Sequence, residues 1–72
     1  MKQASTITIF NQNGHWLMDA RGEFGGGVFG VKLSSPGHAA SLISRYNRNS
    51  AGCSVYVEDG YPDADRLRAM AV

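Results

Sequence analysis

Cysteine is nearly absent from the sequence, with Cys53 as the single example among 72 residues. One cysteine cannot form an internal disulfide, and this usage fits a reducing compartment better than secretion. Long apolar runs are also missing. No segment approaches the roughly 20 apolar residues of a membrane span, and residues 1–10 hold no apolar stretch long enough for a signal peptide. We therefore expect a soluble, cytoplasmic protein without membrane contact.

The chain is short, and its length limits its architecture. A chain of 72 residues forms one domain and buries only about 60% of the surface that its unfolded state exposes. Natural domains of this size often add a disulfide, a metal or a partner subunit to reach adequate stability. We expect a single domain over residues 1–72, either a monomer or a homodimer that pairs the edges of its sheet.

A strong net charge is lacking too. Lys and Arg number 7 and Asp and Glu number 6, which gives a net charge of +1. This balance argues against a polycation that binds nucleic acid through charge alone. The distribution is uneven: residues 1–57 carry five basic and two acidic side chains, and residues 58–72 carry two basic and four acidic ones. The sequence predicts a basic body and an acidic turn.

Side chains suited to catalysis or metal binding are few. The chain has two histidines, His15 and His38, and no paired spacing such as C-x-x-C or H-x-x-x-H that a zinc site uses. Cys53 alternates with valines in a strand-like stretch, which is typical of a small buried apolar residue. We expect no catalytic, cofactor-binding or metal-binding residue, and we interpret the protein as a non-enzyme that uses no cofactor.

Glycine is abundant in one stretch, GEFGGGVFGVKL, where Gly25, Gly27 and Gly30 match the spacing G-x-G-x-x-G. A dinucleotide-binding fingerprint follows a strand and opens directly into a helix. Here Gly30 is followed by the strand-like VKL, and a helix start waits until Pro36. We predict that these glycines form a turn or bulge at residues 25–27 and a bend at Gly30.

Three stretches alternate with the period of two that marks strands, at residues 5–10, 15–20 and 28–33. NQNG, between the first two, supplies the residues that a tight hairpin turn requires. The three strands are expected to form an antiparallel meander. One face of each strand is predicted to carry, in order, Ile7 and Ile9; Trp16, Met18 and Ala20; and the inward-pointing Phe29, Val31 and Leu33.

Residues 34–52 change to a helical period. Ser35 is a suitable cap and Pro36 a suitable first residue. The apolar stripe Ala39, Leu42, Ile43 and Tyr46 is expected to lie across the sheet.

The remainder predicts a fourth strand at residues 53–58 and a short helix within residues 63–70 that Asp63 caps. The order β-β-β-α-β with a short C-terminal helix predicts an α+β fold of two layers. In it an antiparallel sheet packs on one helix and leaves its other face to water or a partner.

Several surface residues are candidates for partner contact. Phe24 lies between Glu23 and a glycine run, where an aromatic ring is hard to bury. Residues 58–65 form an acidic turn that fits a basic partner surface, although a helix N-terminus explains part of its charge equally well. Two arginines are expected to point outward from the main helix. The candidate contacts are Phe24, Glu58, Asp59, Tyr61 (expected to be exposed), Asp63, Asp65, Arg45 and Arg48.

The strands STITIF and HWLMDA, the helix start SSPGHAA and the strand CSVYVE together resemble small phage-encoded anti-CRISPR proteins that block type I surveillance complexes. The resemblance covers most of the chain in element order, but its specific residues are limited to Pro36, Gly37, Ala39 and Ala40. It implies a non-enzymatic inhibitor that binds a Cas subunit in the host cytoplasm and stops target DNA binding or nuclease recruitment. It carries over no functional residue.

Two other classes of function stay open. A small RNA- or DNA-binding module would use Arg21, Lys32, Arg45 and Arg48 together with aromatic side chains. A small enzyme or toxin would use His15, His38 or Cys53. The protein-binding inhibitor is the function that we carry forward, with nucleic-acid binding as its alternative.

Overall fold

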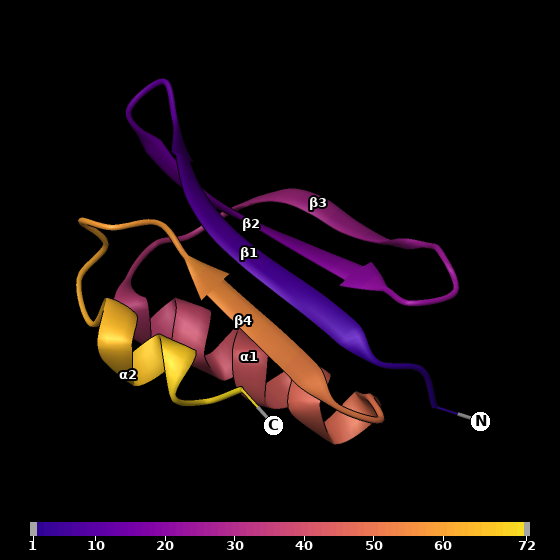
Figure 1. Ribbon diagram of the computed structural model, residues 1–72. Helices are drawn as coiled ribbons and strands as arrows, with labels where there is room; N and C mark the ends of the chain where they lie inside the picture. The colour runs from indigo at the N-terminus through magenta and orange to yellow at the C-terminus, as the bar shows by residue number, and fades with distance from the viewer. Residues whose placement is uncertain (1, 72) are drawn as a thin grey trace.

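The structure is a computed structural model that describes residues 2–71. Four strands and two helices follow one another along the chain (Figure 1). In order, they are β1 (Ser5–Gln12), β2 (His15–Gly22), β3 (Gly27–Lys32), α1 (Pro36–Asn49), β4 (Cys53–Val57) and α2 (Ala64–Arg68). The predicted α+β class is therefore correct.

The sheet is mixed, so the expectation of a wholly antiparallel sheet is wrong. Its strand order is β3-β2-β1-β4, with β1, β2 and β3 antiparallel as expected and β4 parallel to β1. The reason lies in the connections. Two successive reversals leave β3 running in the same direction as β1, and the helical crossover through α1 then starts the next strand in that direction again.

The first hairpin forms as its sequence predicts. Asn13 and Gly14 have φ values of 55° and 81°, the positive values that a two-residue hairpin turn demands. The Asn11 side-chain oxygen accepts a hydrogen bond from the Gly14 amide at 3.2 Å. Both strands extend two residues beyond the predicted ranges, because the same register of pairing continues to their ends.

The main helix also follows its prediction. The Ser35 hydroxyl accepts a hydrogen bond from the His38 amide at 3.1 Å, and Pro36 is the first helical residue. Ala39 and Ile43 are fully buried in the core. Leu42 and Tyr46 pack against it in part.

The short helix α2 differs from expectation in its start. Asp63 has a φ of 62° and its carboxylate makes no capping hydrogen bond, because a capping side chain reaches the first-turn amides from extended backbone rather than from the left-handed region. Leu67 nevertheless joins the core. Figure 1 shows α2 on the same side of the sheet as α1, so two helices rather than one cover this face.

The third strand departs most from the predicted pattern. Met18 pairs with Val31 and Ala20 pairs with Val28, so Phe29 and Gly30 together oppose the single residue between them on β2. This β-bulge inserts one extra residue and reverses the side to which the first half of the strand points. The expectation that Phe29 points inward is therefore wrong, and its side chain is 55% exposed.

Candidate binding face

The face of the sheet opposite the helices is called the open face here. On β1, strand alternation turns Ile7 and Ile9 into the core and sends their neighbours to the other side. The register of the strands continues this face across the whole sheet. The open face consists of Thr6, Thr8, Phe10, Leu17, Asp19, Arg21, Phe29, Lys32, Ser54 and Tyr56.

Aromatic rings lie at both edges of the open face. Tyr56 on β4 is 61% exposed and Phe29 on β3 is 55% exposed. Between them Phe10 and Leu17 are cross-strand partners, and both are half-buried. A solvated sheet face usually alternates to polar residues, whereas exposed aromatic side chains are enriched where proteins bind one another. The open face therefore has the composition of a binding surface.

The bulge in β3 holds Phe29 in place. Gly30 has a φ of 68°, which glycine adopts readily, and its amide donates a 2.8 Å hydrogen bond to the Asp19 carboxylate. The Arg21 guanidinium lies over the Phe29 ring, with its carbon 5.5 Å from the ring centroid. Both β2 side chains thus fix the bulge, and with it the position of the exposed ring.

The prediction from the sequence misses the exposure of Phe29 because it assumes an unbroken two-residue alternation through the whole strand. A glycine inside a strand pattern is a recognised sign of a bulge, and Gly30 is that sign here. The predicted bend at Gly30 has the correct position. The consequence, that every residue before it changes face, requires the register of β2 against β3.

Charge is divided across the open face. Arg21 and Lys32 lie on the β2 and β3 side, where the Asp19 carboxylate is already bound to a backbone amide. Glu58 follows β4 directly, at the opposite edge. The face therefore offers a basic half and an acidic corner, an arrangement that can orient a charged partner.

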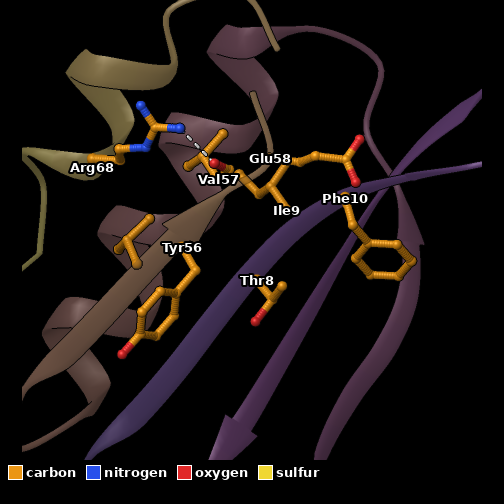
Figure 2. A pocket seen from close by; sticks show the side chains of 8 residues that line it. Thr8, Ile9, Phe10, Tyr56, Val57, Glu58 and Arg68 are labelled. Atoms are coloured by element: carbon orange, nitrogen blue, oxygen red, sulfur yellow. Dashed lines mark hydrogen bonds between the residues drawn. The ribbon is translucent and has the colours of Figure 1, made fainter. Parts of the chain in front are cut away.

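A pocket of about 400 Å³ lies at the acidic corner. Thr8, Phe10, Tyr56, Glu58 and Arg68 are among its lining side chains. Figure 2 shows Tyr56, Thr8 and Phe10 projecting in a row from β4 and β1, with the Glu58 carboxylate above Phe10. The pocket is mostly apolar with one acidic side chain at its rim.

Phe24 is the most exposed large apolar residue in the described part of the chain, at 74%. Its loop is fixed to the N-terminal segment: the Gln3 side-chain oxygen accepts from the Phe24 amide at 2.9 Å, and the Glu23 carboxylate accepts from the Ala4 amide at 2.7 Å. A ring held outward on an anchored loop loses little conformational freedom when a partner covers it.

The acidic turn is built around one arginine. The Arg68 guanidinium pairs with Asp59 and with Asp65, each at 3.0 Å, and donates to the Val57 carbonyl at 2.6 Å. The Asp59 carboxylate and the Val57 carbonyl therefore hold α2 against the end of β4, whereas the Asp65 pair lies within α2 itself. Asp63, which precedes α2 and has a left-handed backbone conformation, is exposed.

Tyr61 is not on the surface, contrary to expectation. Its side chain is 6% exposed and packs edge-on against Trp16, with ring centroids 4.8 Å apart. The ring is drawn inward because packing in the core and against Trp16 removes its apolar surface from water. Burial raises the pKa of the Tyr61 hydroxyl.

Arg45 and Arg48 are exposed on α1, as predicted. They lie on the helix side of the molecule, away from the open face. Lys2 donates a hydrogen bond from Nζ to the Arg48 carbonyl at 3.0 Å. The structure therefore does not combine these arginines with Arg21 and Lys32 into one basic surface.

The candidate catalytic side chains belong to three different elements, β2, α1 and β4. His15 is exposed at the start of β2, and His38 accepts a hydrogen bond from the Ser34 amide at Nδ1, 3.2 Å away. Cys53 is 2% exposed, and burial raises the pKa of its thiol. Within residues 2–71, no three His, Cys, Asp or Glu side chains come together in a way that could hold a metal ion.

None of the helices in the described part of the chain has the length and apolar character needed to traverse a lipid bilayer. Comparisons with protein-family models, with curated proteins and with solved structures find no match. Function therefore has to be inferred from the side chains that this fold exposes.

Proposed function

We propose that this chain is a non-catalytic, protein-binding inhibitor that docks on its partner through the open face. The observation that carries the proposal is the exposure of Phe29 and Tyr56 at the two edges of that face, 55% and 61% respectively. Aromatic side chains are enriched at interfaces and tyrosine is common among residues that dominate binding energy. Such an inhibitor acts by occupying a surface.

Two further features support this function. Phe24 adds a third exposed ring on the anchored loop before β3. Charge is distributed asymmetrically over the open face, with Arg21 and Lys32 in its basic half and Glu58 at its acidic corner. Charges at the rim of an interface speed association and select orientation more than they add affinity.

For the partner, we propose a Cas subunit of a type I surveillance complex, in line with the resemblance to anti-CRISPR proteins. A chain from a phage or mobile element would then work in the host cytoplasm. The single thiol of Cys53 supports a reducing compartment. Occupation of the subunit would prevent target DNA binding or nuclease recruitment.

The experiment adds the purified chain to a purified type I surveillance complex and measures binding of a target DNA duplex. We expect loss of DNA binding, or of nuclease recruitment, at about equimolar chain. The double variant Phe29→Ser/Tyr56→Ser should lose the inhibition, and the matched helix-side variant Arg45→Ala/Arg48→Ala should keep it. Inhibition lost only in the helix-side variant would assign docking to α1 instead of the open face.

Single-stranded nucleic-acid binding is the second candidate, and one observation favours it. Arg21 and Lys32 share the open face with the rings of Phe29 and Tyr56, and exposed rings on a sheet with nearby basic groups are a platform on which bases stack. It predicts that fluorescence anisotropy of single-stranded RNA or DNA oligonucleotides rises with added chain at low salt and that affinity falls steeply as salt increases. No binding at low salt would exclude it.

A further inference from the structure

We propose that the pocket at the acidic corner of the open face receives a cationic side chain, lysine or arginine, from the protein partner. This inference rests on the proposed function and names the chemistry that the partner presents. The pocket has a volume of about 400 Å³, which is large enough for a single side chain. Its lining combines aromatic rings with a carboxylate, and both attract a cation.

The two rings are placed by the parallel pairing of β1 and β4. Thr8 pairs with Tyr56, and Phe10 lies two residues further along β1 on the same face. Strand spacing of about 4.8 Å and a rise of about 3.3 Å per residue separate the backbones of Tyr56 and Phe10 by about 8 Å. Each ring attracts a cation that comes within about 6 Å of its centroid, the range of a cation–π contact. The Thr8 side chain lies between the rings (Figure 2).

The charge of the site is supplied by Glu58. Its amide donates to the Ile9 carbonyl at 2.9 Å, which fixes its backbone beside Phe10. Both ion pairs found among residues 2–71 belong to Arg68, so the Glu58 carboxylate has no basic partner there. Figure 2 shows this carboxylate above the Phe10 side chain, at the rim of the pocket.

Arg68 also lines the pocket, but its charge is already offset. The guanidinium bonds to the Val57 carbonyl and to the carboxylates of Asp59 and Asp65. These three acceptors hold it at the edge of β4. Asp59 and Asp65 lie outside the pocket lining but bind Arg68, so Glu58, Asp59, Asp65 and Arg68 together carry a charge of −2, which favours a cation over an anion.

The chemistry of the pocket selects against other occupants. A phosphate would meet the Glu58 carboxylate at close range and be repelled. An apolar side chain would remove water from that carboxylate without giving it a partner, which is unfavourable. A lysine or arginine places its alkyl stem against the rings and its charge beside Glu58.

The test uses single blocked amino acids as probes, namely N-acetyl-lysine methylamide and N-acetyl-arginine methylamide, with the neutral N-acetyl-norleucine methylamide as control. Nuclear magnetic resonance follows the ring protons of Phe10 and Tyr56 in the full chain. We expect saturable shifts with both cationic probes, with a dissociation constant in the millimolar range, and none of comparable size with norleucine.

Two variants identify the source of selectivity. Glu58→Gln should weaken binding of both cationic probes by about fivefold or more. Asp63→Asn removes the same charge from an exposed acid outside the pocket, so it should leave the affinity for the probes unchanged. Asparagine also tolerates the left-handed backbone at this position. Equal shifts with norleucine and lysine, or equal affinity in Glu58→Gln and the unaltered chain, would overturn the inference.

The failure of this inference and of the proposed function can be told apart. If the cationic probes bind selectively while Phe29→Ser/Tyr56→Ser still inhibits the surveillance complex, the pocket binds cations as argued, but docking of the partner through the open face is wrong. If that variant loses inhibition while the probes show no preference for charge, the open face stands and the cation pocket is wrong.

Discussion

Single residues show which positions of this small fold do not tolerate a larger side chain. Gly27 begins β3 with a φ of 150°, and a Cβ there would collide with the Ala20 carbonyl oxygen across the sheet. Backbone atoms in a sheet cannot rotate away as a flexible side chain can. This position in the glycine stretch is therefore set by close strand packing rather than by a ligand.

The first prediction concerns this glycine. Gly27→Ala should lower the free energy of unfolding by about 2 kcal/mol, because it adds both a clash and a strained backbone. Gly37→Ala is the matched control: it lies in the first turn of α1 with only ordinary contact to the Ser35 side chain, so alanine should be neutral or stabilising. Urea denaturation measures both, and equal stability of the two variants would contradict the assignment.

The second prediction concerns alkaline pH. Burial raises the pKa of Cys53 and of Tyr61, so the native state keeps protons that the unfolded state releases. The free energy of unfolding should therefore fall as the pH rises above the ordinary pKa of a free thiol, about 8.5. Urea denaturation at neutral and alkaline pH tests this.

Cys53→Ala removes the thiol's part of the pH dependence and leaves that of Tyr61. The slope of stability against pH near pH 9 should therefore be smaller in this variant. A free energy of unfolding that stays constant or increases over the same range in the unaltered chain would show that these groups ionise without a penalty in the native state.

At the scale of elements, a prediction from the sequence is correct where the pattern behind it involves only neighbouring residues. The Asn13–Gly14 turn and the helix start at Ser35 and Pro36 are decided by neighbours in sequence, and both form as predicted. The direction of β4 and the face of Phe29 depend on pairing between distant segments. The candidate site was predictable only in part, because Phe29 changes face through the bulge and Tyr61 is drawn into the core.

The third prediction concerns the attachment of α2. Arg68→Ala removes the hydrogen bond to the Val57 carbonyl and both aspartate contacts. It should lower the free energy of unfolding by about 1 kcal/mol, most of it from the carbonyl bond, since exposed ion pairs contribute little. Amide hydrogen exchange in α2 should become faster.

Arg66→Ala is the matched control for this variant, because Arg66 is exposed on the same helix. It should change neither the stability nor the exchange rates measurably. If both variants behave alike, Arg68 does not hold α2 against β4. Charge reversal of Asp59 or Asp65 would disturb the same contacts, so Asp63 and Glu58 are the better positions for testing partner electrostatics.

At the scale of the whole molecule, the two sides of the sheet differ in what they bury and expose. The radius of gyration is 11.3 Å, close to the value of about 11 Å for a compact chain of this length. The helix side holds the buried core, whereas the open face exposes rings at both edges. Under the proposed function, stability and binding depend on separate sets of residues, so a change on the open face should leave the fold intact.

This separation leads to the fourth prediction. Phe29→Ser and Tyr56→Ser should each change the free energy of unfolding by less than about 1 kcal/mol, since both side chains are more than half exposed. Ile43→Ala, in the core under the same sheet, should lower it by about 2–5 kcal/mol. Thermal or urea denaturation measures all three. A loss in the open-face variants as large as that in Ile43→Ala would mean that these rings stabilise the fold.

The most direct measurement is a comparison of partner capture by three immobilised chains: the unaltered chain, Phe29→Ser/Tyr56→Ser and Arg45→Ala/Arg48→Ala. Each is exposed to purified type I surveillance complex, and to host lysate treated with nuclease. We expect the unaltered and helix-side chains to retain the same protein at about equimolar amounts, and the open-face variant to retain less than a tenth as much. Equal retention by all three chains, or retention abolished by the nuclease, would contradict protein binding through the open face.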